Sequence, residues 1–217
     1  MCKELVNLNG FEKMSKEQIE DGIKVLNMIT WYQIKYNEPD TDRAINAIRD
    51  GIASSIIGFD LCNTAKNGFD CADSTNGHLL EVKAVNYSAK SWGATFNDTT
   101  EKKALSFTDK NVYLQVPLWV EAGKISFFMI GNNPEVGNWL LEKVNHYNKN
   151  RKSIRCTQTL PMTKLYKDFG FKIVAVSHTK DQVVKMLQDK HRKAFKYLKV
   201  EDIMTVDEYN EWINQNP

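Results

Sequence analysis

The chain has 217 residues, of which 42% are hydrophobic and 26% charged, and its formal net charge is +2. This composition is ordinary for a globular protein and excludes a wholly disordered or fibrous chain. No apolar run approaches the ~20 residues that span a bilayer, and the start lacks the apolar core of a secretory signal. We therefore expect a cytoplasmic protein that makes no membrane contact.

The first third of the sequence predicts two helices. Ser15–Gln18 has the pattern of a capping box, and apolar residues recur after it at helical spacing as far as Ile34. Pro39 interrupts this pattern. A second helix is expected to begin near residues 40–42 and to end at Gly58, because glycine commonly follows the last turn of a helix.

The next segment changes to strand periodicity. Residues 69–73 and 78–85 predict two strands joined by a tight turn that contains Asn76-Gly77, a dipeptide typical of hairpins. A polar loop is expected from Asn86 to Phe96. Asn97 is then expected to cap a short helix that ends near Phe107.

The second half of the sequence alternates between strand and helix patterns. Strands are expected over residues 112–120, 124–130, 153–160 and 171–176, and helices over 134–147, 161–169, 180–199 and 205–215. Pro117 argues against an unbroken central strand in the first of these. We expect one domain over residues 1–217, of the α/β (α+β) class, with a central mixed sheet flanked by helices.

Charged side chains of the predicted hairpin carry the chemical signal. Side chains alternate faces along a strand, so Glu81 and Lys83 point to the same side. A two-residue turn sets Asp70 opposite Lys83, whereas a four-residue turn sets it opposite Glu81, and both place the three groups on one face. Only an odd turn length or a bulge would favour Asp73 instead.

Two carboxylates this close repel each other unless a cation lies between them, and hard oxygen ligands favour Mg²⁺ or Mn²⁺. A lysine beside them can stabilise negative charge that develops on a phosphate. The combination of Asp70, Glu81 and Lys83 therefore favours metal-assisted hydrolysis of a phosphodiester. The alternative is an ordinary Glu–Lys pair on a solvated strand. The apolar residues around them, Leu79 to Val85, weigh against it because buried charges are costly.

The segment Gly68–Asp73, read as GFDCAD, and the segment His78–Ala84, read as HLLEVKA, resemble the core hairpin of the PD-(D/E)xK nuclease superfamily. The resemblance covers residues 40–176 and implies a restriction-endonuclease-like core. Extra helices would then occupy residues 1–39 and 177–217. Phe69 stands where the name of the superfamily calls for proline.

The resemblance also implies roles for single residues. Asp70 and Glu81 would bind Mg²⁺, for which Mn²⁺ can substitute, and the main-chain carbonyl of Val82 would be a further ligand. Lys83 would assist the attacking water. Some members carry an additional acidic residue on the preceding helix, and Asp50 is the candidate for it here.

In size and layout the chain is most similar to the type II restriction endonucleases of this superfamily. The expected activity is therefore site-specific cleavage of double-stranded DNA, by a homodimer whose two-fold symmetry matches a palindromic site. Another nuclease of the same fold (phage, repair or homing) is an alternative. A DNA-binding module without chemistry is a second one, against which the intact set of Asp70, Glu81 and Lys83 argues.

Two segments supply candidate DNA contacts. The polar loop from Asn86 to Asn97 directly follows the catalytic strand, although a surface loop anchored by aromatics explains it equally well. The stretch 149–159 lies in a region, residues 143–200, with fifteen basic and only three acidic side chains, which suits phosphate contacts. The expected contact residues are Asn86, Lys90, Trp92, Thr95, Asn97, Arg151, Lys152, Arg155, Thr157 and Gln158.

Overall fold

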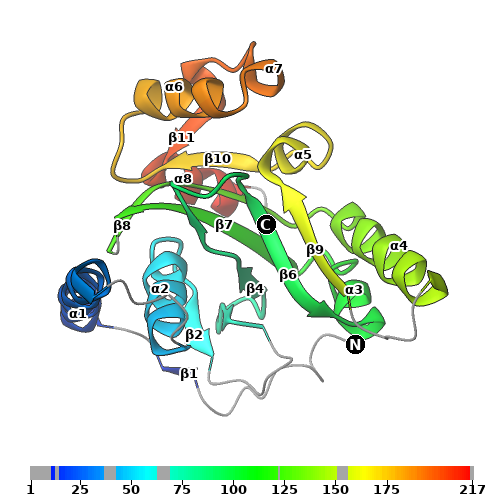
Figure 1. The fold of residues 1–217 in the computed structure, drawn as a ribbon, viewed down its shortest axis with the longest axis horizontal. Coiled ribbons are helices and arrows are strands. Elements are labelled where there is room, and N and C mark those ends of the chain that lie inside the picture. The colour runs from blue at the N-terminus through cyan, green and yellow to red at the C-terminus, as the bar shows by residue number, and fades with distance from the viewer. Residues whose placement is uncertain are drawn as a thin grey trace.

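A computed structural model describes residues 11–12, 15–36, 43–62, 69–121, 123–150 and 156–215. Within these ranges the centre of the fold is a mixed sheet of nine strands (Figure 1). The strands are β1 (Phe11–Glu12), β2 (Asp60–Cys62), β3 (Cys71–Ala72), β4 (Leu79–Val82), β5 (Val85–Asn86), β7 (Val112–Glu121), β8 (Lys124–Gly131), β10 (Lys172–Ala175) and β11 (Ile203–Thr205). Their order is β1-β2-β3-β4-β7-β8-β10-β11, and β5 pairs with β7 beyond the end of β4.

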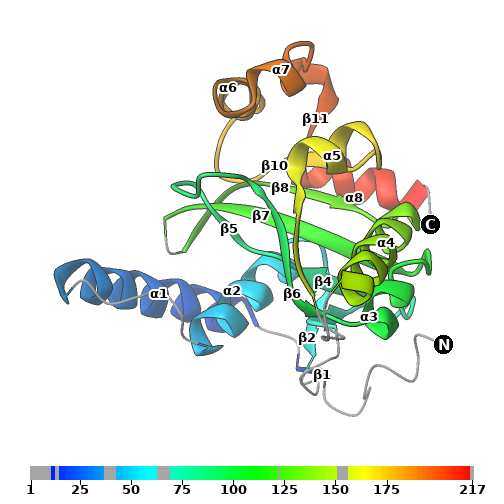
Figure 2. The same cartoon turned by 45° about the vertical axis from the view of Figure 1, so that its right-hand side comes forward.

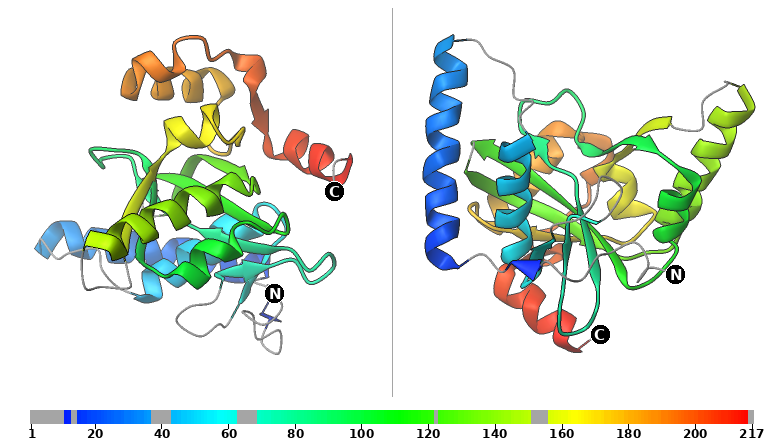
Figure 3. Two further views of the ribbon diagram at one scale, coloured as in Figure 1. Left: turned by 90° about the vertical axis from the view of Figure 1, so that its right-hand side faces the viewer. Right: turned by 90° about the horizontal axis from the view of Figure 1, so that it is seen from below.

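Helices cover both faces of this sheet, as Figures 2 and 3 show from other sides. One face packs against α1 (Lys16–Tyr36), α2 (Arg43–Ser55) and α8 (Val206–Gln215). The other face packs against α3 (Glu101–Ser106), α4 (Glu135–Asn150), α5 (Met162–Lys167), α6 (Lys180–Lys190) and α7 (Arg192–Phe195). The predicted α/β class, with a central mixed sheet between helices, is confirmed.

The central strands are apolar on both sides because each side contacts a different core. Along β7, Leu114 and Val116 belong to the core under α3 and α4, while Tyr113 and Trp119 belong to the core under α1 and α2. A strand buried on both faces has a continuous apolar sequence instead of an alternating one, which explains the run from Val112 to Val120.

Pro117 lies inside β7 without breaking it. β4 pairs with β7 as far as Gln115, and β5 takes over from Leu118, so the proline falls at the junction between these two neighbours. On its other side β7 pairs with β8 through this region, with Pro117 opposite Phe128. The sheet thus places the residue that lacks an N–H group at a gap in one ladder.

A separate two-stranded ribbon is formed by β6 (Gly93–Thr99) and β9 (Cys156–Pro161). Figure 1 shows it crossing the same side of the sheet as α3, α4 and α5. The expected loop through Phe96 therefore ends earlier than predicted, and Asn97 lies within β6. The helix cap is Thr100, whose side chain accepts a hydrogen bond from the N–H of Lys103.

Three other expectations can be compared with the structure. The capping box at the start of α1 is confirmed, since Gln18 N donates to Ser15 Oγ and Ser15 N donates to Gln18 Oε1. The helix expected over 180–199 is divided at His191 into α6 and α7. The sequence pattern missed β11, which pairs in parallel with β10. No helix in the described parts of the chain is both long and apolar enough to cross a membrane.

Candidate active site

The hairpin that carries the predicted catalytic residues has a four-residue turn. Cys71 pairs with Leu80 and Ala72 with Leu79, and Asp73 N donates to the carbonyl of His78 at 2.8 Å. Residues 74–77 therefore form the turn, and Gly77 adopts a left-handed φ of 71° that glycine tolerates without strain. This register, extended by one residue, sets Asp70 opposite Glu81, as the four-residue alternative predicted.

The turn explains why Asp73 is not part of the site. Its Oδ1 accepts a hydrogen bond from Thr75 N and its Oδ2 accepts one from Asn76 Nδ2, both at 2.8 Å. The side chain that an odd turn would have placed in the site thus holds the turn itself.

Asp70, Glu81 and Lys83 line one cavity of about 430 Å³. Its wall also includes Asp50 from α2 and Lys103 from α3. Residues 95–100 of β6 and the following cap close another side. The cavity thus joins the hairpin that carries Asp70 and Glu81, the preceding helix, the ribbon and the next helix.

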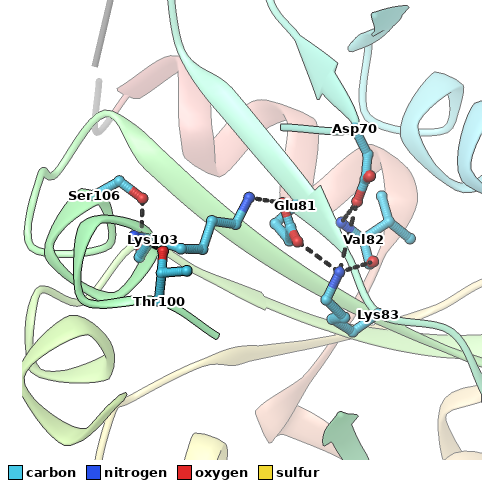
Figure 4. Close-up of polar contacts among 7 residues, drawn as sticks. All are labelled: Asp70, Glu81, Val82, Lys83, Thr100, Lys103 and Ser106. Atoms are coloured by element: carbon cyan, nitrogen blue, oxygen red, sulfur yellow. Dashed lines mark hydrogen bonds and ion pairs between the residues drawn. The ribbon is translucent and has the colours of Figure 1, made fainter. Parts of the chain in front are cut away.

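Three oxygen atoms meet around the Lys83 ammonium group (Figure 4). Its Nζ lies 2.6 Å from Glu81 Oε1, 3.2 Å from the carbonyl oxygen of Val82 and 3.9 Å from Asp70 Oδ2. Asp70 Oδ2 also accepts a hydrogen bond from Val82 N at 2.8 Å, which fixes the carboxylate against the neighbouring strand. The predicted ligands and the predicted lysine therefore converge on one point.

A second lysine contacts Glu81. Lys103 Nζ lies 2.6 Å from Glu81 Oε2, so each oxygen of this carboxylate has its own ammonium partner. The Glu81 side chain is only 6% exposed, and those of Lys83 and Lys103 are 22% and 17% exposed. Because water reaches these groups poorly, the two lysines supply most of the compensation that the Glu81 charge needs.

Burial and charge pull the pKa values of this cluster in opposite directions. Burial raises the pKa of Glu81, but the charges of Lys83 and Lys103 outweigh it and hold the pKa below its usual range. Burial lowers the pKa of Lys83, but the Glu81 and Asp70 carboxylates outweigh it and raise the pKa above its usual range. Glu81 is thus ionised and Lys83 protonated at neutral pH.

The two aspartates behave differently. Burial, followed by the charge of Glu81, raises the pKa of Asp70 to about 6. Burial, followed by the charge of Asp70, raises the pKa of Asp50 to about 8. Carboxyl groups with raised pKa values in a shared cavity are typical of sites that concentrate negative charge for a cation or a reaction.

The oxygen atoms of this cavity fit a magnesium ion. Among the described residues, no three His, Cys, Asp or Glu side chains are grouped as a complete metal cage. Mg²⁺ does not require such a cage, since it is commonly bound by one or two carboxylates together with water and substrate phosphates. Asp70, Glu81 and the Val82 carbonyl already surround one cation, the ammonium of Lys83, with hard oxygen donors.

The candidate DNA contacts fall into separate places. Thr95 and Asn97 are exposed on β6 and line the same cavity as Asp70 and Glu81. On β9, Thr157 is exposed and Gln158 half-buried. Asn86 and Lys90 are exposed beside β5 but do not line this cavity. Three predicted contacts lie outside the described residues: Arg151, Lys152 and Arg155.

The expectation that Trp92 contacts DNA is wrong. Its side chain is 1% exposed and lies in the main core, where its ring meets that of Phe127 edge to face. Its Nε1 donates to the carbonyl of Tyr87. The large apolar ring is buried because it fills the space between the ribbon and the sheet, so it cannot reach a ligand on the surface.

Lys103 is the site residue that the sequence pattern missed. In the sequence Glu101-Lys-Lys-Ala it is indistinguishable from a surface lysine. In the structure it lies in the six-residue helix α3 that Thr100 caps, and its local sequence carries no signal that separates it from Lys102.

No protein-family model matches the sequence, and no curated protein sequence is significantly similar to it.

Proposed function

We propose that this protein is a Mg²⁺-dependent, sequence-specific endonuclease for double-stranded DNA, of the type II restriction kind. The observation that carries the proposal is the meeting of Asp70 Oδ2, Glu81 Oε1 and the Val82 carbonyl around the Lys83 ammonium, in a cavity open to solvent. Two carboxylates and a carbonyl can bind Mg²⁺, and a lysine beside them can stabilise negative charge on a phosphate, which together suit metal-assisted phosphodiester hydrolysis.

Asp70, Glu81 and the Val82 carbonyl would hold the Mg²⁺ ion. When bound, the ion would supply Lewis-acid activation and neutralise negative charge on the phosphate. Lys83 is protonated in this environment, so its Nζ donates hydrogen bonds. Once released from Glu81, it can orient the attacking water or stabilise a phosphate oxygen within the same cavity.

The β6–β9 ribbon is the surface we assign to DNA. Its inner side chains, Phe96 and Leu160, are buried against the sheet. Thr95, Asn97 and Thr157 on its outer side are exposed, polar and uncharged. The major groove admits a two-stranded ribbon, and asparagine and threonine side chains can contact base edges there. Because Thr95 and Asn97 also line the cavity, a groove contact would bring a backbone phosphate near Lys83.

Incubation of the purified protein with plasmid and phage DNA tests the proposal. In MgCl₂ we expect discrete fragments, and sequencing of the fragment ends should return one short motif. Lys83→Met should abolish cleavage while the fold, measured by circular dichroism, stays intact. Exposed Lys102 on α3 offers a matched control, and Lys102→Met should cleave like the wild type.

The possible results separate the alternatives. A smear that Lys83→Met abolishes indicates a nuclease of the same chemistry without sequence specificity. Salt-dependent binding of duplex DNA without cleavage in Mg²⁺ or Mn²⁺ indicates a binding module and refutes the enzymatic proposal. Failure to bind or cleave any duplex DNA refutes both.

Asn97→Ala tests the ribbon contact. The side chain is exposed, so the thermal stability should stay unchanged. Loss of a paired contact to a base is expected to weaken binding to the cognate site by about 1–3 kcal/mol. The affinity for the cognate duplex is measured in the presence of Ca²⁺ and compared with the affinity for a duplex whose recognition site is altered. Equal affinities of the variant and the wild type for the cognate duplex would remove Asn97 from the DNA surface.

A further inference from the structure

Lys83 and Lys103 contact the same carboxylate from different sides. Lys83 Nζ lies among the oxygens of Glu81, Val82 and Asp70, which are the atoms we assign to the metal. Lys103 Nζ lies at Glu81 Oε2 and 4.0 Å from the centre of the buried Phe69 ring. The Lys83 ammonium thus occupies the position that we assign to the metal, and the Lys103 ammonium lies on the other side of the Glu81 carboxylate (Figure 4).

The two positions differ in what a bound metal would require. A divalent ion and the Lys83 ammonium would compete for the same oxygens, so Lys83 has to withdraw when the ion binds. Lys103 contacts the opposite oxygen of Glu81 and can keep that contact. Its backbone is held in place as well, because Lys103 N donates to Thr100 Oγ1 and its carbonyl accepts from Ser106 Oγ.

Without Lys103, Glu81 would have no partner for Oε2. The carboxylate could then turn both oxygens towards Lys83, which would strengthen the ammonium that competes with the metal. Side chains that orient a ligand in this way typically contribute 10- to 100-fold to metal affinity.

We propose that Lys103 is a positioning residue that holds Glu81 in its metal-binding orientation, while Lys83 is an exchangeable cation that yields its place to the metal. This inference rests on the metal requirement of the proposed function but not on the identity of the substrate. It predicts opposite effects of the two lysines on metal affinity. If the lysines acted only through their positive charge, removal of either would tighten the binding of a dication.

The experiment is calorimetric titration of the full chain with Mn²⁺. We expect Lys83→Met to bind Mn²⁺ more tightly than the wild type and Lys103→Met to bind it about 10- to 100-fold more weakly. Lys103→Arg, which keeps the charge and the reach, should restore most of the affinity. Lys102→Met, on the same helix but exposed, should bind like the wild type.

Cleavage provides a second readout. A higher Mg²⁺ concentration should restore the rate of Lys103→Met but not that of Lys83→Met, since only the former loses its rate through weaker metal binding. Circular dichroism and thermal unfolding check that each variant folds. If Lys103→Met does not fold, Lys103→Gln replaces it, since its amide removes the charge and keeps a hydrogen-bond donor.

The outcomes distinguish this inference from the proposed function. Unchanged or tighter Mn²⁺ binding by the neutral Lys103 variant overturns the positioning role. Absence of Mn²⁺ binding by the wild type overturns the metal site and, with it, the proposed function. The predicted opposite shifts in affinity, found in a protein that cleaves no DNA, support the roles of the lysines and refute only the nuclease.

Discussion

Glu81 and Glu208 each contact a lysine, but in opposite surroundings. Glu81, which is 6% exposed, lies between Lys83 and Lys103 in the cavity that Asp70 also lines. Glu208 on α8 is 50% exposed and contacts Lys180 of α6, with Nζ 2.7 Å from Oε1. The contacts use the same chemical groups and nearly the same distances. They differ in how much water surrounds the charges.

This difference separates a site from a structural contact. On the surface, water stabilises both charges with or without the pair, so the contact contributes little to stability. In the cavity each charge depends on its neighbours, because solvent is largely removed. A cluster of mutually dependent charges is expensive to keep in a folded chain. Its presence beside an exposed ribbon therefore indicates a use beyond holding the sheet together.

The largest expected effect on stability comes from Glu81→Ala. The change removes the carboxylate that both Lys83 and Lys103 contact, and removal of one partner from a buried ion pair costs about 3–5 kcal/mol. Urea unfolding in EDTA measures the free energy of unfolding. A loss below about 1 kcal/mol would mean that water solvates the cluster as it solvates a surface pair. Glu81 and Glu208 would then not differ in how strongly their lysine contacts stabilise the fold.

Asp50→Asn should have the opposite sign. Because burial raises the pKa of Asp50 to about 8, its protonated form favours the folded state. The associated stability is fully present below the usual pKa of about 4 and is lost as the pH rises through about 8. Above that pH the metal-free variant should exceed the wild type by about 1 kcal/mol or more, seen as a melting temperature about 2–4 °C higher.

Thermal unfolding in EDTA at pH 5 and pH 9 checks this prediction. The gain of Asp50→Asn should be several-fold larger at pH 9 than at pH 5, because most of the range between the two pKa values lies above pH 5. A variant at the exposed Asp181, Asp181→Asn, removes one charge from the surface and separates the effect from a change in net charge. An equal gain of Asp50→Asn at both pH values would show that the carboxyl group does not titrate in the cavity.

The smallest effect is expected from Lys180→Met. The side chains of this pair are 25% and 50% exposed, so loss of the contact should cost no more than about 1 kcal/mol. Glu208 keeps its other role, because its Oε2 still accepts a hydrogen bond from Thr205 N at the start of α8. Urea unfolding at low and high salt measures the difference, which salt should reduce. A cost near that of Glu81→Ala would show that this exposed contact between α6 and α8 stabilises the fold as strongly as the buried cluster does.

The sequence was sufficient to predict which charged side chains of the hairpin lie together. Strand side chains repeat every two residues, so Asp70, Glu81 and Lys83 share a face for any even turn length. The class of the fold followed from the alternation of strand and helix patterns for the same reason: local periodicity reports which side of an element is buried.

What the sequence could not predict depends on contacts between distant segments. Lys103 follows Glu81 by 22 residues, and only the crossing of α3 beside β4 brings the two together. In the sequence, Trp92 resembles an aromatic residue that stacks on a ligand from a loop. The pairing of β6 with β9 turns its side chain into the core instead. The sequence pattern predicts a helix cap at Asn97 and not a strand. The partner of β6 lies some 60 residues later in the chain, so no local pattern reports the pairing.

The number of residues in the hairpin turn determines which side chains of its two strands lie on the same face of the sheet. Insertion or deletion of one residue between Ala72 and Leu79 would shift the pairing by one step and carry Asp70 to the opposite face from Glu81. A change of two residues would keep both carboxylates together. Length variation in this turn is therefore constrained by parity, and we expect variants of the chain to keep Asp70 and Glu81 on one face only when the turn lengthens or shortens by an even number of residues.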